Sequence, residues 1–361
     1  MKRQRSHIQS LATLQFAAVI TIVLAHFWLK EATYLQALCT SFCFVYSGYF
    51  TAMTRRGDRS YRMADHVRYM RGKLAKLYPL HVFALGLCFL AIYLSWDCTP
   101  AFTRVTIAHL LLISPWFTTP SFYFGVNPVS WFICDLFFLY LISPFLIKGL
   151  KCCRLHWQVA IVVALIILEL VAAYAPDAGS PSLLIPDKSH YYLYEFPLIR
   201  VLDFITGIVL YHITLSRPWH TAASRLTPAR ATLVEMCALA VLIAFGAIGE
   251  KMLLPHWYRA FCSVAPAVVA VLGAFLLTSG NKGLVSRALC LPPLPALSKI
   301  GAEVYLLQFG AYYSIRPLVR WLGMPEQGAV YFLIQMGGLL VIAWVVHHFL
   351  TLPLYRRLRS R

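Results

Sequence analysis

The sequence predicts an all-α protein, a polytopic membrane bundle of about ten transmembrane helices with both termini in the cytoplasm. Hydrophobic residues make up 60% of the 361 positions and charged residues only 13%, which excludes an ordinary soluble domain. Apolar runs near the ~20 residues needed to cross hydrocarbon recur along the whole chain. The alternating segments of about ten residues that form an outer-membrane barrel do not appear. We therefore interpret residues 1–361 as a single integral membrane domain.

The expected spans follow these apolar runs in chain order. They cover residues 8–29, 35–53, 77–96, 130–147, 157–175, 197–215, 232–248, 260–279, 300–320 and 329–350. The first run follows MKRQRSH and superficially resembles a signal peptide. It is too long for that and lacks a small-residue cleavage site, so we expect it to be retained as the first span.

Residues 105–117 form the doubtful segment, because this run is too short for a crossing. The charge pattern decides its placement, since cytoplasmic loops hold the excess of Lys and Arg. If the segment does not cross, 24 of the 32 Lys and Arg residues lie inside, seven lie outside and Arg200 lies within a span. If it crosses, 16 lie inside and 15 outside. We therefore predict ten crossings, with 105–117 as a short helix at the outer side or dipping into it.

The formal net charge of +18 is explained by this orientation. The chain has no aromatic-basic recognition module or zinc-finger spacing, so nucleic acid is not an expected partner. The ten cysteines include no CxxC pair and most lie in apolar segments, where they are typical small core residues. No metal site is expected.

His26 lies near the outer end of the first expected span, beside Phe27 and Trp28. A histidine there suits an aromatic belt at the membrane interface. It equally suits a base that transfers protons, because imidazole titrates near neutral pH. Gln15 precedes His26 by three helical turns, about 16 Å along the same helix face. The spacing predicts a polar stripe that runs inward from the imidazole.

The second span and the basic loop after it carry two further signals. Ser47-Gly48-Tyr49 combines a glycine that permits close helix approach with a serine that can hydrogen-bond across it, which is also typical of ordinary packing. The loop at 55–76 holds eight Lys and Arg residues, a pattern typical of topogenic charge and of attraction to anionic lipid. Lys73 and Lys76 should project from one helix face at the membrane boundary, where they could hold phosphates.

Acids within apolar runs are costly to bury, so each should face the protein interior or water and have a partner. Asp135 lies in the fourth span. Arg200 and Asp203 stand three residues apart on one helix and can pair, which we interpret as structural. Glu303 precedes the Tyr-Leu-Leu-Gln segment at 305–308, where a hydrogen-bonded structural role is the simpler interpretation.

In their order along the chain, these features resemble the acyltransferase 3 family of integral membrane acyltransferases over nearly the whole sequence. The family pattern has a first helix that ends in a catalytic His, then a Phe-Phe-x-x-Ser-Gly-Tyr/Phe segment and a basic RxxR-like loop that leads into Tyr-Pro. A Trp-rich helix entry, a Phe-x-x-Gly helix and a late Tyr-Leu-x-His segment follow. The similar segments here are His26, Phe44 to Tyr49, Lys73 to Pro79, Ser130 to Asp135, Asp203 to Gly207 and Tyr305 to Gln308.

The chain departs from this pattern at three places. The family usually has an arginine eleven residues before the histidine, where this chain has Gln15. The arginines of the basic motif correspond to Lys73 and Lys76, which keep the charge but lose the bidentate geometry. The late histidine is Gln308. These departures leave open a divergent branch of the family or a catalytically silent relative.

The resemblance implies transfer of an acyl group, most often acetyl, from cytoplasmic acyl-CoA to a hydroxyl of a surface or exported polysaccharide or glycolipid in a bacterial inner membrane. His26 would take the proton of the attacking hydroxyl, and Asp135 would orient the imidazole or bind acceptor hydroxyls. Direct transfer and an acyl-histidine intermediate both stay open. The 3′-phosphate and pyrophosphate of the donor suit Arg68, Arg71, Lys73 and Lys76.

The same resemblance implies the remaining contacts and partners. Trp131 would stack on a sugar face, and the residues expected to line the acceptor site are Ser47, Tyr49, Trp131, Gln15, Glu303 and Gln308. Acyl-CoA is a co-substrate, and no bound cofactor is expected. Membrane lipid and a polysaccharide-synthesis machinery are the expected partners. A transporter or flippase for an amphiphilic glycan is the alternative, although no paired, Gly/Pro-broken segments occupy matching places in two halves of the sequence.

Overall fold

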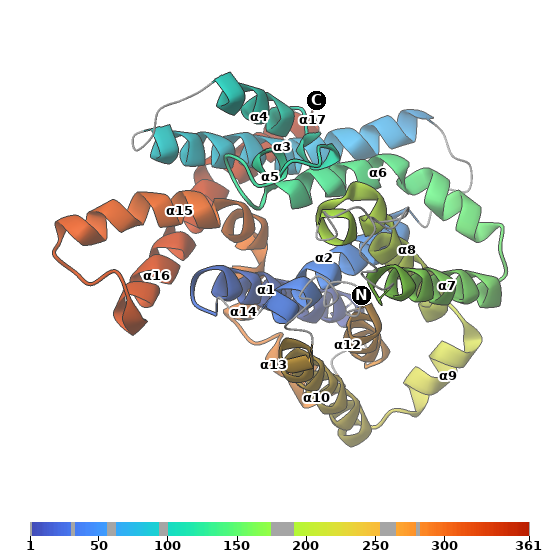
Figure 1. Cartoon of the computed structure of the whole chain (residues 1–361). Coiled ribbons are helices and arrows are strands. Elements are labelled where there is room, and N and C mark those ends of the chain that lie inside the picture. The colour runs from blue at the N-terminus through green and yellow to red at the C-terminus, as the bar shows by residue number, and fades with distance from the viewer. Residues whose placement is uncertain are drawn as a thin grey trace. The chain divides into compact units, whose positions relative to one another are not determined.

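A computed structural model describes residues 2–29, 33–55, 63–93, 100–174, 191–252, 265–278 and 282–360 (Figure 1). These residues are overwhelmingly helical and include no strand, which confirms the predicted all-α class. The chain divides into two compact units, and one of the three boundaries along the chain lies inside the long helix α6 (Ser130–Lys151). Unit 1 comprises Met1–Arg59 and Ile142–Lys299, and unit 2 comprises Ser60–Leu141 and Ile300–Arg361.

Unit 1 contains the first two helices of the chain, the C-terminal part of α6 and the helices that follow α6 up to α14. Its elements are α1 (Lys2–Phe27), α2 (Thr33–Thr54), α7 (Leu155–Tyr174), the π-helical turn η2 (Tyr191–Glu195), α8 (Pro197–Thr214), α9 (Arg217–Arg225), α10 (Pro228–Met252), α12 (Ala265–Leu277), α13 (Leu284–Ala288) and α14 (Leu294–Leu297). The 3-10 turn η4 (Ser298–Ile300) stands at its boundary with unit 2.

Unit 2 contains the N-terminal part of α6 and the last helices of the chain. Its elements are α3 (Met63–Tyr93), α4 (Pro100–Leu110), the 3-10 turn η1 (Ser114–Trp116), α5 (Pro120–Tyr123), α15 (Gly301–Trp321), α16 (Gly328–Val346), the π-helical turn η5 (His347–Thr351) and α17 (Leu352–Ser360).

Each of the ten expected spans overlaps a helix. Residues 94–96, 175, 260–264 and 279 of these spans lie outside the described part of the chain. Within the described residues, six helical stretches are long and apolar enough to cross a membrane: Gln9–Phe27, Met63–Ala91, Ser130–Lys151, Tyr191–Thr214, Pro228–Gly246 and Gly328–Leu358. The apolar stretches of α7 and α12 are shorter. The number of ten crossings and the cytoplasmic placement of both termini stay predictions.

The doubtful segment at 105–117 begins within α4, continues past its end and includes η1. Helix α4 has 11 residues and is not among the six candidates in the described chain. The helix ends where Leu112 adopts a left-handed backbone (φ 58°), which interrupts the helical hydrogen bonding. His109 near its end is fully buried, and burial lowers the pKa of this imidazole to about 3. The Nε2–H of His81 on α3 donates to the His109 backbone carbonyl at 2.9 Å, so the His81 ring anchors the end of α4 within unit 2.

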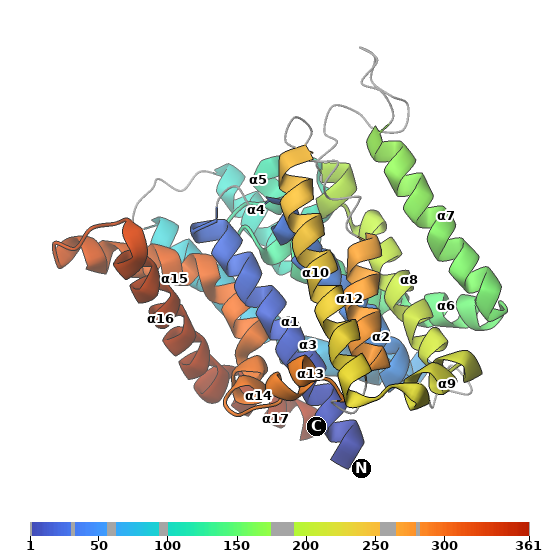
Figure 2. The ribbon, with the colours of Figure 1, turned by 90° about the horizontal axis from the view of Figure 1, so that it is seen from below.

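Helices α2 and α8 cross at a pair of glycines in unit 1. A Cβ built on Gly48 would lie 2.1 Å from the Phe204 carbonyl oxygen, and one built on Gly207 would lie 2.0 Å from the Val45 carbonyl oxygen. The two backbones therefore touch, which only glycine allows. Helices α1, α10 and α12 also contact α2, and Figure 2 shows α10 and α12 side by side.

Unit 2 is held together by the packing of α15 on α3 and α16. The buried amide of Asn127 donates to the Leu306 carbonyl at 2.9 Å, which ties the segment before α6 to α15. Close by in sequence, the rings of Phe132 and Tyr305 lie 4.9 Å apart between their centroids. The Trp-rich entry to α6 and the Tyr-Leu-Leu-Gln segment therefore lie side by side.

Candidate active site

His26 occupies the last turn of α1 and is half-buried. Its Nε2 lies 3.0 Å from Nε2 of Gln36 in the first turn of α2. Both facing atoms are nitrogens, so with the amide placed in this way its N–H donates and the imidazole accepts, which leaves the ring proton on Nδ1. Sequence reasoning missed Gln36, which forms a hydrogen bond with the predicted base.

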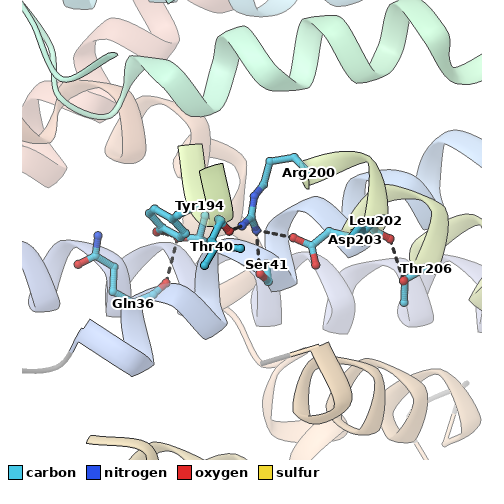
Figure 3. A network of polar contacts seen from close by, with 9 residues as sticks. Gln36, Thr40, Ser41, Tyr194, Arg200, Leu202, Asp203 and Thr206 are labelled. Carbon is cyan, nitrogen blue, oxygen red and sulfur yellow. Dashed lines mark hydrogen bonds and ion pairs between the residues drawn. The ribbon is translucent and has the colours of Figure 1, made fainter. Parts of the chain in front are cut away.

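A buried polar network continues from Gln36 along α2 (Figure 3). The Gln36 carbonyl accepts from the Thr40 hydroxyl at 2.9 Å, and Thr40 in turn accepts from the Tyr194 hydroxyl of η2 at 2.9 Å. Gln36 and Thr40 stand four residues apart on one helix face, and Ser41 follows directly. This polar stripe in an otherwise apolar span is the sequence signal that could have identified the network.

Arg200 on α8 is the centre of this network, with only 1% of its surface exposed. Its guanidinium donates to Asp203 Oδ2 at 2.6 Å, to Ser41 Oγ at 3.1 Å and to the Leu193 carbonyl at 2.8 Å. The predicted pairing of Arg200 with Asp203 is thus confirmed. A buried cation that satisfies three acceptors holds α2, η2 and α8 in one arrangement.

The Ser47-Gly48-Tyr49 motif lies at the crossing of α2 and α8. The Ser47 hydroxyl donates within its own helix to the Cys43 carbonyl at 2.8 Å. The Tyr49 ring is buried and packs edge-on against Tyr211, 5.6 Å between centroids. The structure therefore gives the motif a packing role, while the predicted contacts of Ser47 and Tyr49 with an acceptor stay predictions. Gln15 is half-buried on α1.

The basic loop contributes α3 of unit 2, and residues 56–62 of that loop lie outside the described part. Lys73 is partly buried, with Nζ 4.1 Å from the Tyr140 ring centroid and 5.3 Å from that of Tyr69. These are cation–π distances. The four cations predicted to bind the donor therefore differ in exposure. Lys73 is partly buried, whereas Arg68, Arg71 and Lys76 are exposed.

Arg55, the first cation of the same loop, belongs to unit 1 and has a different environment. It is 6% exposed and donates from Nη1 to the buried Ser143 hydroxyl at 3.3 Å. Arg55 thereby ties the end of α2 to α6. It is not available at the surface for donor phosphates.

Three other predicted residues lie in the interior of unit 2. Asp135 and Trp131 on α6 are 0% and 3% exposed, and Gln308 on α15 is 1% exposed. The Gln308 amide donates to the Tyr305 carbonyl of its own helix at 2.7 Å. Their expected roles toward an acceptor stay predictions, as does the pairing of Asp135 with His26, because these two residues belong to different units.

Glu303 has a partner that the sequence reasoning missed. Its Oε1 lies 2.8 Å from Nδ1 of His347, which is held in the π-helical turn η5 after α16. The two residues are far apart along the chain, and His347 stands next to a second histidine in a segment that shows no motif. Unit 2 therefore contains its own imidazole–carboxylate pair.

The family model of the acyltransferase domain matches this chain over residues 8–348. The chain belongs to the acyltransferase 3 family. This confirms the resemblance drawn from the collinear motifs, each of which is loose when taken alone. The match covers helices of both units and includes His26, all of α16 and the first two residues of η5.

The chain is similar to a protein from Streptomyces mycarofaciens named "Acyltransferase MdmB". The two sequences are 26% identical over 250 residues, which cover 67% of this chain. The match spans 60% of the length of MdmB. No solved structure matches this chain.

Proposed function

We propose that this chain is a membrane O-acyltransferase, which moves an acyl group, acetyl in the first instance, from acyl-CoA to a hydroxyl of a surface or exported polysaccharide or glycolipid. A bacterial inner membrane is the proposed location. The observation that carries the proposal is the half-buried imidazole of His26, hydrogen-bonded at the junction of α1 and α2 in a chain of this family. Several apolar helices of spanning length support the membrane setting.

His26 is proposed as the base of the reaction. An acceptor hydroxyl is a poor nucleophile, and its attack on a thioester requires that a group of near-neutral basicity take its proton. The Gln36 amide carries a donor and an acceptor on the same end, so a half-turn of the amide lets it donate to neutral imidazole or accept from imidazolium. Gln36 can therefore hold the ring in both protonation states.

The exposed cations of α3 are proposed to bind the donor. A CoA thioester carries a 3′-phosphate and a pyrophosphate, which Arg68, Arg71 and Lys76 can neutralise from the surface of unit 2. Lys73 is held between two tyrosine rings, so its charge is fixed in position rather than mobile. Acyl-CoA as donor rests on this charge pattern together with the family.

Transfer of label from radiolabelled acetyl-CoA to a cell-surface glycan fraction tests the proposal with purified protein in lipid nanodiscs. Wild-type protein is expected to move the label, and His26→Ala is expected to abolish the transfer while the protein still inserts and accumulates. The matched control is His220→Ala, an exposed histidine on α9 whose loss should leave transfer unchanged. Unchanged transfer by His26→Ala would remove His26 from the mechanism.

The rival functions give different outcomes in the same assay. A transporter or flippase leaves the label on the thioester. A silent family member also leaves it there, and co-purifies with polysaccharide-synthesis proteins instead. Mass spectra of surface glycans from cells with and without the protein identify the acyl group and the acceptor, because each modified unit gains the mass of that acyl group.

A further inference from the structure

The turn that joins α15 to α16 in unit 2 is fixed by the way α15 ends. The N–H of Gly323 donates to the Arg320 carbonyl at 3.0 Å. The N–H of Met324 donates to the Val319 carbonyl at 3.1 Å. These two bonds form a Schellman motif, and Gly323 takes the left-handed backbone that this motif requires (φ 66°). The chain therefore turns back, and Glu326 contacts the last turns of α15.

Two arginines of α15 share the Glu326 carboxylate. Nε of Arg316 donates to Oε2 at 2.6 Å, and Nε of Arg320 donates to Oε1. The hydrogen bonds from Arg320 and Arg316 lower the pKa of the Glu326 carboxyl, so one negative charge faces two positive charges. The arginine side chains are 42% and 59% exposed, and their Nη amines make no hydrogen bond to a described residue. One positive charge and several N–H donors are therefore available to an anion.

A row of hydroxyl and amide groups adjoins these arginines. Tyr312, Arg316 and Arg320 stand four residues apart and so form one stripe along α15. On α16, which packs against α15, the Gln335 amide donates to the Tyr331 hydroxyl at 3.0 Å. Tyr331 also hydrogen-bonds with the Tyr312 side chain. Both helices therefore contribute polar groups next to the cationic pair.

The amide of Gln335 has an unused acceptor. Gln335 is only 8% exposed, and its Oε1 makes no hydrogen bond within the described part of the chain. A buried acceptor without a partner is costly, and a hydroxyl of a bound molecule would supply the missing donor. The arginines lack an anion and the amide lacks a hydroxyl. An acidic sugar carries both groups, whereas a phospholipid phosphate supplies only the anion.

We propose that this end of α15 and α16 binds an acidic glycan. The Nη amines of the two arginines bind the carboxylate or phosphate of the sugar, because a guanidinium matches the geometry of both anions. The tyrosines and Gln335 bind its hydroxyls. The distribution of Lys and Arg predicts that this turn faces outward, where surface and exported glycans lie. That this glycan is the acyl acceptor rests on the proposed function, whereas the binding itself does not.

Isothermal titration calorimetry of the full chain in phosphatidylcholine nanodiscs tests the binding. The probes are trigalacturonate, maltotriose 1-phosphate and neutral maltotriose. Wild-type protein is expected to bind at least one acidic probe about tenfold more tightly than maltotriose. The preferred acidic probe tells a carboxylate ligand from a phosphate ligand. Arg316→Gln and Arg320→Gln should each remove about tenfold of that affinity and leave the weak binding of maltotriose unchanged.

The matched control is Arg225→Gln, which removes an exposed arginine of α9 in unit 1 and should bind all probes as wild type does. Equal affinity for acidic and neutral probes would overturn the proposal, as would unchanged affinity in the two arginine variants. Absence of binding to both acidic probes would overturn it as well. Retention of phospholipid that depends on the arginines, seen in native mass spectra, would then assign them to a lipid headgroup.

Inhibition of acyl transfer tests whether the bound glycan is the acceptor. The acidic probe that binds is expected to compete with the cell-surface glycan fraction for the wild-type protein. Its inhibition constant should rise about tenfold in Arg320→Gln, in step with the lost affinity. Binding without inhibition would overturn the identification with the acceptor. Absence of label transfer by the wild-type protein would refute the proposed function, while the calorimetry still decides whether unit 2 binds the acidic glycan.

Discussion

At the scale of residues, the two imidazoles of interest differ in their partners. His26 faces an amide, Gln36, whereas His347 faces a carboxylate, Glu303. An amide can donate a hydrogen bond to the ring or accept one from it, whereas a carboxylate can only accept one. The amide partner therefore suits the proposed role of His26 as a base, because a base changes its protonation state during the reaction.

Gln36→Leu tests whether the amide positions His26. Loss of one hydrogen bond to the imidazole costs about 1–1.5 kcal/mol, which corresponds to about a tenfold lower rate. We expect kcat to fall by this factor while KM for both substrates stays unchanged, because the ring loses its orientation but the substrates lose no contact. Gln9→Leu, an exposed glutamine on α1, is the matched control. A change confined to KM would contradict a positioning role.

Contacts within one helix could be predicted from the sequence, whereas contacts between distant segments could not. The Arg200–Asp203 pair was predictable, because residues three apart on one helix always lie on the same face. Arg55 was not predictable as a buried residue, because its hydrogen bond to Ser143 joins segments far apart in sequence. The same applies to Lys73, whose charge lies between two tyrosine rings.

At the scale of elements, the family motifs pack against one another in pairs. The Ser-Gly-Tyr segment of α2 meets the Phe-x-x-Gly segment of α8 through Gly48 and Gly207. In unit 2, the Trp-rich entry to α6 meets the Tyr-Leu-Leu-Gln segment of α15 through the rings of Phe132 and Tyr305. The motifs are therefore explained in part as the surfaces at which helices touch.

Gly48→Ala and Gly207→Ala test the crossing of α2 and α8. Each added methyl would collide with a backbone carbonyl, so each variant should lower stability by about 1–3 kcal/mol, the usual cost of overpacking. Thermal unfolding in detergent measures the loss. Gly273→Ala on α12 is the control, since nothing lies within 4 Å of its added Cβ.

The double variant sharpens this test. Both methyls separate the same two backbones, so once the first substitution has pushed the helices apart, the second should cost much less. Together the two substitutions should therefore destabilise by clearly less than the sum of the single effects. Simple additivity would show that the two glycines do not share one contact.

At the scale of the whole molecule, the distribution of Lys and Arg residues predicts the orientation of the chain in the membrane. Ten crossings place 24 of the 32 Lys and Arg residues on one side, and this asymmetry is lost if the segment at 105–117 also crosses. Helix α4 has 11 residues, fewer than the ~20 that a crossing needs, and the orientation itself stays a prediction.

Reporter fusions test this orientation. A fluorescent protein fused to the C-terminus should fluoresce, because that end is predicted to be cytoplasmic. Alkaline phosphatase fused at Met324, between α15 and α16, should be active, because that loop is predicted to face outward. A crossing at α4 would invert both results, whereas a fusion placed before α4, after Leu29, is outside in either case and controls for expression.

The sequence by itself determined the helical membrane class, the order of the helices and the family. These follow from local runs of composition and from the order of short motifs along one chain, which do not depend on how helices meet. Only the tertiary structure decided that Gln36 holds His26 and that Glu303 holds His347. Such partners lie on different helices, and no periodicity encodes them, because helix packing sets which side chains come within hydrogen-bonding distance.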